Sequence, residues 1–216
     1  MKKIFLTVAV AMFAVLGVSA QNGDIVFAKS VQNIRIGYAG VANASNSNLA
    51  GGVDLGVNII QIGVKPYSTG AITVGADFLM DTYHPTKDHY FLTVDHRTVI
   101  VPSIFTKTKY SGSTVLGFGI PLDFTQKIGR NLAITLGAAA RINLNASTRL
   151  VYADSDKKWH TERASGIHTN RVTYDLHCSV DVDGFGIYAA YAPMNVFEDG
   201  YGPSFNMFSV GLIFKH

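Results

Sequence analysis

Residues 113–147 read STVLGFGIPLDFTQKIGRNLAITLGAAARINLNAS, and their pattern carries the clearest information about the fold. Its two halves share one pattern, because apolar residues stand at the even positions from Leu116 to Phe124 and again from Leu132 to Leu144. The odd positions between them are mainly glycine, alanine and polar residues. Successive side chains of a strand point to opposite faces, so each half is expected to be a strand with one apolar face. The stretch therefore predicts a long β-hairpin.

The length of the two arms distinguishes between two settings for this alternation. A half-buried sheet in water and a membrane barrel with a polar lumen both produce it. Strands of soluble proteins usually have about 5–6 residues, whereas a strand that crosses a bilayer needs about 9–11. Both arms exceed the longer figure, and the charged and amide side chains on their second face suit a narrow lumen. We therefore expect a membrane barrel, and a soluble exported β-sandwich is the alternative.

The start of the chain has the order of a secretory signal peptide. Lys2 and Lys3 supply a positive start, an apolar run follows, and Ala20 closes a small-residue cleavage site. The apolar run is too short to span a bilayer as a helix. We expect residues 1–20 to be removed and residues 21–216 to form one barrel domain in the outer membrane.

Composition argues against several classes of function. The formal charge of +3 falls to +1 when Lys2 and Lys3 leave with the signal peptide, and no basic block follows, so nucleic acid is not an expected partner. Hydrophobic residues make up 48% of the chain, with a mean hydropathy of +0.21. These hydrophobic residues alternate with polar or small ones along the strands and are not concentrated in long runs, as a membrane barrel requires. The single cysteine, Cys178, cannot form an internal disulfide, and it falls on the apolar face of its strand.

Similar alternation marks eight strands along the chain. They are expected at 33–40, 52–64, 71–82, in the two arms of the hairpin, and at 170–183, 185–192 and 208–214. After Ile59 the apolar positions change phase, which predicts a β-bulge. Long connections, among them 83–112 and 149–169, alternate with short turns such as the one at Asp183 and Gly184. This order predicts an all-β fold: an eight-stranded antiparallel up-and-down transmembrane β-barrel with long extracellular loops. Loop 83–112 is expected to be exposed and has room for a hairpin of its own.

Short motifs follow one another along the second half of the chain. They are GIPLDFTQKIG at 119–129, LGA at 136–138, GIH at 166–168, YAPMNVF at 191–197, GP at 202–203 and SVGL at 209–212. In this order they resemble small outer-membrane β-barrel proteins of the Bacteroidetes, a family often labelled porin-like. The resemblance implies an eight-stranded barrel in the outer membrane. It also implies an aromatic residue at the end, where this chain has Lys215 and His216 after Phe214.

Polar residues on the inward face form the candidate site. The set comprises Arg35, Asp54, Asn58, Asp77, Asp123, Arg141, Asn143, Asp175, His177 and Asp181. The interior of an eight-stranded barrel is just wide enough for side chains to fill it. Acids and bases there are expected to pair, because an unpaired buried charge is costly. The first interpretation is therefore a filled lumen with a polar network. The alternative is a narrow conduit for small solutes, lined by Asp77, Asp123, Arg141 and Asp175.

Two other chemistries involve residues of these strands and loops. His177 and Ser179 share a face with two aspartates, and a lipid-modifying enzyme would need such a pair within hydrogen-bonding reach. The loop histidines His84, His89 and His96 stand near aspartates, but their spacing matches no tetrahedral metal site. Aromatic residues are expected to form an interfacial girdle and lipid contacts: Tyr38, Phe78, Tyr83, Phe118, Phe124, Tyr152, Tyr174, Tyr191 and Phe208.

These patterns predict a structural or surface-interaction protein and not an enzyme. We expect no catalytic residue, no metal and no cofactor. The expected partners are outer-membrane lipid and an extracellular ligand or protein that binds through loops 83–112 and 149–169. The barrel is expected to be a monomer. Passive passage of small solutes is the alternative function, and the lipid-modifying enzyme is the third.

Overall fold

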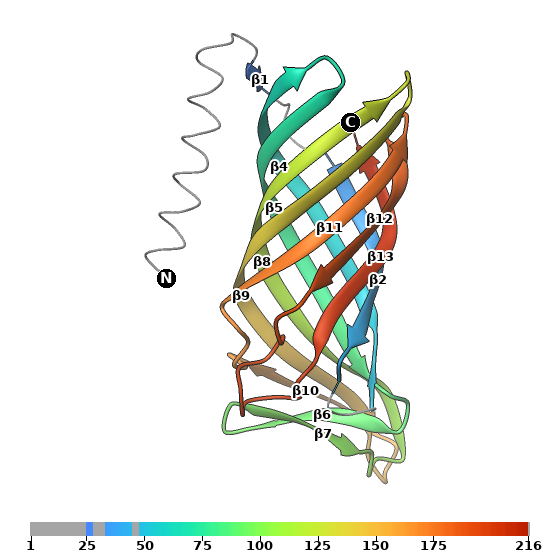
Figure 1. The fold of residues 1–216 in the computed structure, drawn as a ribbon. Helices are drawn as coiled ribbons and strands as arrows, with labels where there is room; N and C mark the ends of the chain where they lie inside the picture. The colour runs from blue at the N-terminus through green and yellow to red at the C-terminus, as the bar shows by residue number, and fades with distance from the viewer. Residues whose placement is uncertain (1–24, 28–32, 45–47, 216) are drawn as a thin grey trace.

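The computed structural model describes residues 25–27, 33–44 and 48–215. The predicted signal peptide, residues 1–20, lies outside the described residues. The described chain is built from antiparallel strands, and it includes no helix long and apolar enough to cross a membrane. The strands are β1 (Ile25–Phe27), β2 (Asn33–Ala42), β3 (Leu49–Ala50), β4 (Gly52–Tyr67), β5 (Gly70–Pro85), β6 (His89–Val94), β7 (Arg97–Pro102), β8 (Lys107–Ile128), β9 (Leu132–Ala153), β10 (Trp159–Ser165), β11 (Val172–Val182), β12 (Phe185–Ala192) and β13 (Asn206–Lys215) (Figure 1).

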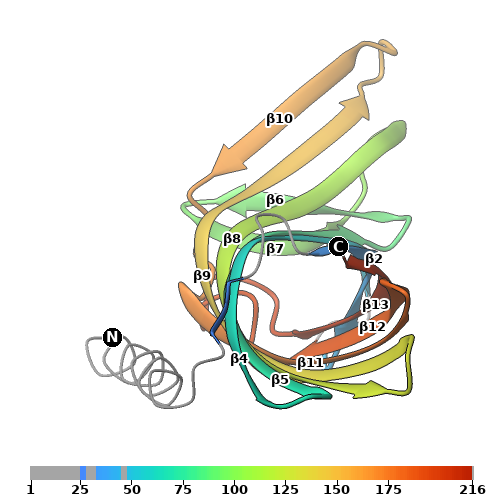
Figure 2. The same ribbon diagram turned by 90° about the horizontal axis from the view of Figure 1, so that it is seen from above.

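Eight of the described strands close into a ring. Their order is β2, β4, β5, β8, β9, β11, β12 and β13, and β13 pairs back onto β2. The closing register runs from Asn206 opposite Ala42 to Lys215 opposite Asn33. Figure 2 shows the ring seen along its axis. The predicted fold class, an eight-stranded antiparallel up-and-down barrel, is confirmed, and closure leaves no open sheet edge within the ring.

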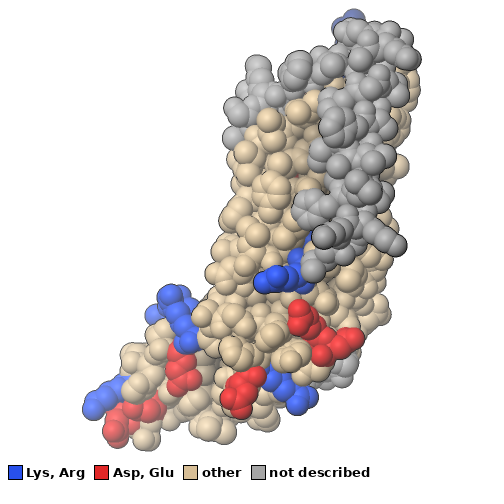
Figure 3. All heavy atoms as spheres, turned by 90° about the vertical axis from the view of Figure 1, so that its left-hand side faces the viewer, with Lys and Arg blue, Asp and Glu red and all other residues tan. Residues whose placement is uncertain are grey.

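The outer face of the ring carries the apolar residues of the alternation. Leu136 and Leu176, for example, are 58% and 54% exposed. No other sheet or helix of the described chain covers this face. Figure 3 shows one side of the molecule, on which charged side chains gather toward the end that carries β6, β7 and β10. An uncovered apolar belt of this kind is the surface that lipid covers in a membrane barrel.

The turn between β11 and β12 has the expected chemistry. Asp183 and Gly184 both adopt positive φ angles, of 51° and 84°. A two-residue hairpin turn with positive φ at both central residues has a twist that matches the flanking strands. Asp-Gly is a favoured pair for this turn. The short connections lie at one end of the barrel, called here the turn end; the opposite end, with β6, β7 and β10, is called the distal end (Figure 1).

The predicted bulge after Ile59 is confirmed. The register between β4 and β5 shifts between Asn58 and Ile60, and both Ile59 and Ile60 are exposed, at 44% and 48%. A second bulge, which the alternation does not predict, lies between β8 and β9, where Leu116 faces Asn145 but Gly117 faces Asn143.

The central hairpin is longer than predicted. β8 and β9 have 22 residues each, which corresponds to about 70 Å of strand at about 3.3 Å per residue. Tilted by about 40°, such strands rise about 50 Å, well beyond a hydrocarbon core of about 30 Å. Residues 107–112 and 149–153, predicted to be loop, are therefore corrected to strand that continues past the belt.

The long loops add strands to these extensions. β6 and β7 form the hairpin that loop 83–112 was expected to hold. The loop is not simply exposed, however, because Tyr90 and Phe91 are buried. β10 pairs with the end of β9, from Ser165 opposite Ser147 to Trp159 opposite Ala153. The ends of β8 and β9, with β10, form a three-stranded sheet that leans away from the ring (Figure 2); this sheet and the β6–β7 hairpin are called the distal sheet.

Candidate functional site

The ten predicted lumen residues all come from inward positions of the ring strands. Eight of them are buried, and Asn143 and His177 are half-buried. They come from β2, β4, β5, β8, β9 and β11. Alternation alone turns them inward, because their neighbours on each strand carry the apolar outer face.

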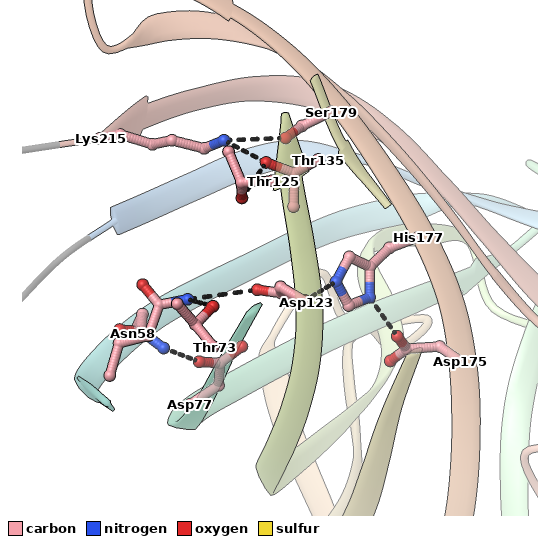
Figure 4. A network of polar contacts seen from close by, with 11 residues as sticks. Asn58, Thr73, Asp77, Asp123, Thr125, Thr135, Asp175, His177, Ser179 and Lys215 are labelled. Carbon is pink, nitrogen blue, oxygen red and sulfur yellow. Dashed lines mark hydrogen bonds and ion pairs between the residues drawn. The ribbon is translucent and has the colours of Figure 1, made fainter. Parts of the chain in front are cut away.

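His177 connects two carboxylates inside the barrel. Its Nε2 atom lies 2.7 Å from Oδ1 of Asp123 on β8, and its Nδ1 atom lies 3.1 Å from Oδ1 of Asp175 on its own strand (Figure 4). Gly137 of β9 lies between them in the register, opposite both Asp123 and His177. A Cβ atom at this glycine would clash with both side chains. The missing side chain of Gly137 is therefore what lets His177 reach across β9.

Two arginines form a second group, deeper in the lumen. Arg141 makes an ion pair with Asp81, and its Nη1 atom lies 3.9 Å from Oδ2 of Asp175. All three side chains are almost fully buried. A buried pair with good geometry is tolerated, but removal of one partner leaves an uncompensated charge.

Arg35 makes looser contacts than Arg141. Its Nε atom is 3.9 Å from Oδ1 of Asp54, and its guanidinium carbon lies 5.7 Å from the centre of the Tyr188 ring. The Tyr188 hydroxyl donates a 2.8 Å hydrogen bond to Oδ2 of Asp54. The tyrosine therefore contacts both members of the ion pair and fixes their positions on β2 and β4.

Lys215 joins the site near the turn end. Its ammonium group donates to Ser179 at 3.1 Å and to Thr135 at 3.0 Å (Figure 4). It also donates to Asp181. Ser179 therefore contacts the lysine, whereas both ring nitrogens of His177 contact aspartates. No hydrogen bond joins Ser179 to His177 in the described structure, so the pair that the enzyme hypothesis requires is not assembled here.

A cavity opens at the turn end of the lumen. Its volume is about 420 Å³, and Asn58, Asp77, Asp123, His177 and Lys215 line it with other polar residues. Gln61 bridges part of this lining, because its amide donates to Asp123 at 3.4 Å. This half of the barrel is thus polar and partly open.

An apolar layer fills the ring at the distal end. Six ring strands contribute inward side chains, and the connections after β10 and β12 contribute further ones. The buried members are Ala39, Tyr83, Val115, Ala146, Ile167, Ala192, Val196, Phe197, Phe205 and Met207. Between this layer and Arg141 the cavity volume is only about 20 Å³. The layer separates the polar lumen from the distal side.

Two of the predicted girdle positions are corrected, because Tyr83 belongs to the apolar layer and Tyr152 lies on the extension of β9 that pairs with β10. Tyr83 is only 2% exposed and points inward, where its hydroxyl contacts the sulfur of Met207 at 2.9 Å. Tyr152 lies on the part of β9 that pairs with β10, and its ring stacks on Phe105 in the connection between β7 and β8. Tyr38, Phe78, Phe124, Tyr174 and Tyr191 do lie on the exposed outer face, and Phe118 and Phe208 are half-exposed.

Several residues of the site were missed from the sequence. Asp81 has the same inward parity as Asp77 on β5. Tyr188 and Lys215 stand at positions that alternate with the outward apolar residues of β12 and β13. Strict alternation would therefore have found all three. The apolar layer had a weaker signal, namely apolar residues such as Val196 and Phe197 within a predicted loop. Nothing in the local pattern indicates that this loop folds back into the ring.

The loop histidines do not converge. The Nδ1 atom of His84 is 2.8 Å from the carbonyl oxygen of Ser111, and that of His89 is 3.1 Å from the Thr86 hydroxyl. His96 lies edge-on to His168. Within the described residues, no three His, Cys, Asp or Glu side chains are placed to hold a metal ion.

No family model matches the chain, and no curated protein matches it. Among solved structures, the attachment invasion locus protein Ail of Yersinia pestis is similar over 87% of this chain and 100% of that one, with 11% sequence identity and a TM-score of 0.33. Similarity at this level supports no argument about function. The closed ring and its apolar exterior define the fold class instead: an eight-stranded β-barrel of the outer-membrane type.

Proposed function

We propose that this protein is a monomeric outer-membrane barrel that does not conduct ions and that acts at the cell surface through its distal sheet. The apolar layer is the observation on which the non-conducting half of this proposal rests. An ion that crosses such a layer loses its hydration without gaining a charged partner, which is unfavourable. The ion pairs beneath it, at Arg141 and Asp81, fill the centre of the lumen further.

The surface role is supported by the open edge of β10. This strand pairs only with β9 in the described structure, so its second edge presents unpaired backbone groups. Most of its residues are exposed, including Trp159 and His160. Proteins commonly bind extended segments by adding a strand to such an edge. Glu162 and Arg163 place charges on this edge, and charges of this kind limit indiscriminate pairing. A partner with an extended segment suits this surface.

Passive passage of small solutes is the second candidate. The polar cavity of about 420 Å³ at the turn end favours it, because a conduit would need such a space. The two functions differ in planar bilayers. Purified protein is expected to give no discrete conductance steps, whereas a variant with Phe197→Ala and Phe205→Ala is expected to conduct because it thins the layer. Discrete steps from the wild-type protein that change with Asp77→Asn would support the conduit instead.

Surface display is tested by cysteine labelling in intact cells. In a Cys178→Ser background, cysteine replaces Asp156 in the turn before β10, or Arg130 in the turn between β8 and β9. A membrane-impermeant maleimide is expected to label position 156 in intact cells and position 130 only after the outer membrane is opened. Labelling in the reverse order would overturn the proposed orientation, and equal labelling at once would overturn surface display.

A further inference from the structure

The wall of the barrel has a break in strand pairing near the distal end. β9 pairs with β11 as far as Ile142 opposite Val172, and with β10 from Ser147 opposite Ser165. The four residues between, 143–146, have no strand partner on this side. Residues 166–171 run alongside them instead, and a cavity of about 440 Å³ lies there. Its lining consists of Asn143, Leu144, Asn145, Ala146, Gly166, Ile167, His168, Thr169, Arg171 and Glu198.

The segment that carries Arg171 is firmly held. The backbone N–H of Asn143 donates to the Arg171 carbonyl at 2.9 Å, and the Asn143 side-chain amide donates to the Asn170 carbonyl at 2.6 Å. The Asn170 side chain in turn donates to the carbonyls of Asn195 and Phe197, at 2.7 and 3.0 Å. Arg171 is therefore presented from a fixed backbone.

Of the two charged residues that line the cavity, Glu198 has a side-chain partner and Arg171 has none among the described residues. Glu198 contacts Nδ1 of His168 at 3.2 Å. The guanidinium of Arg171 is exposed and has no hydrogen bond or ion pair with any described residue. Asn145 adds an exposed amide. An unpaired guanidinium on a fixed backbone is suited to a phosphate group, which it can bind with two parallel hydrogen bonds.

One apolar side chain of the barrel exterior lines the cavity, and others follow along β11 toward the turn end. Leu144, in its lining, is 66% exposed, and Tyr174 and Leu176 on β11 are 49% and 54% exposed. They belong to the belt that faces lipid. The cavity thus lies between the apolar belt, to which Leu144 belongs, and the distal end, toward which charged side chains gather in Figure 3.

We infer that this cavity binds the phosphate headgroup of a membrane lipid from the leaflet on the distal side. Arg171 contacts the phosphate, Asn145 adds a donor, and acyl chains lie over Leu144, Tyr174 and Leu176. Basic pockets at the membrane boundary recognise anionic lipids by this chemistry. The inference rests on the lipid-covered exterior of the proposed function, but not on the distal sheet or on a closed lumen.

The test measures binding to the folded full-length protein in a neutral detergent by titration with dihexanoyl phosphatidic acid. Inorganic phosphate and dihexanoyl phosphatidylcholine serve as comparison probes, and backbone amide signals of residues 166–171 report the site. Arg171→Gln is expected to weaken phosphatidic acid binding about tenfold or more, as expected for loss of a charge-assisted contact. Arg171→Lys is expected to lose less, because it keeps the charge.

Arg130→Gln is the matched control, since it removes the same charge from an exposed turn at the far end of the barrel. It is expected to bind as the wild type does. A gel that compares boiled and unboiled samples verifies that each variant is folded. Equal affinity of the Arg171→Gln variant and the wild type, or equal losses in the Arg171→Gln and Arg130→Gln variants, would overturn the inference. Inorganic phosphate bound as tightly as phosphatidic acid would overturn the lipid as ligand, and absence of binding to the wild type would overturn the site itself. None of these results would alter the conductance or labelling tests above.

Discussion

The Nε2 atom of His177 lies 2.7 Å from Oδ1 of Asp123, although the two residues belong to strands that are not neighbours in the ring. β9 separates β8 from β11, and it passes between them with a glycine, Gly137. The contact therefore depends on one residue that takes no part in it. The packing of the polar lumen can therefore be tested by replacing Gly137, which leaves every charged residue in place.

Gly137→Ala is expected to destabilise the barrel by about 1–3 kcal/mol, which is typical when a methyl group is forced into a filled space. The added Cβ would displace His177 from Asp123. Urea unfolding in lipid vesicles measures the change. Ala138→Val, one residue along and on the exposed outer face, is the control and is expected to change stability by less than about 0.5 kcal/mol. Equal stability of the Gly137→Ala variant and the wild type would contradict the tight contact.

Arg141→Ala is expected to cost about 3–5 kcal/mol, because it leaves Asp81 buried without its ion-pair partner and Asp175 with the contact to His177 alone. The double variant Arg141→Met with Asp81→Leu is expected to lose less than Arg141→Ala, since it removes a charge of each sign. The same unfolding measurement compares them. If the double variant were less stable than Arg141→Ala, the cost of Arg141→Ala would not come from leaving Asp81 unpaired.

The turn before β10 is expected to depend on pH. Hydrogen bonding to His160, and then to the backbone N–H of Lys158, lowers the pKa of Asp154. A lowered pKa means that folding favours the ionised carboxylate. The ionised Asp154 carboxylate therefore contributes fully to stability above the ordinary aspartate pKa of about 4. This contribution is lost as the pH falls through the lowered pKa.

An NMR titration of the Asp154 carboxyl measures this effect. His160→Ala is expected to raise the pKa of Asp154 toward its ordinary value, and amide exchange in the turn is expected to quicken at acidic pH. His89→Ala, in the other long loop, is the control and is expected to leave Asp154 unchanged. A pKa of Asp154 that does not respond to His160→Ala would contradict the contact.

Alternation predicted most of the fold because each ring strand has lipid on one side and the lumen on the other. The phase change after Ile59 was visible for the same reason, since it moves apolar residues onto the wrong parity. The bulge beside Leu144 was not visible, because Asn143 and Asn145 are both polar and hide the change of phase. The family resemblance to Bacteroidetes porin-like proteins remains a prediction.

The closure of the lumen could not be predicted in this way. It depends on Phe197 and Phe205, which come from a connection and meet Tyr83 from a strand more than a hundred residues earlier. Local pattern gives the direction of a side chain on its own strand, but not which distant loop folds over it. The break in pairing beside Arg171 is equally non-local, because it requires the ends of three strands to be known.

Lipid covers the apolar face of the ring, and the native cysteine on that face is the position at which this can be measured. Cys178 is exposed on that face, between Val180 and Leu176 on β11. A fluorophore attached to Cys178 in detergent, followed by reconstitution into vesicles whose acyl chains carry bromine, reports what surrounds it. Strong quenching of the fluorophore by the brominated chains, and none by aqueous iodide, is expected. Quenching by iodide alone would contradict it.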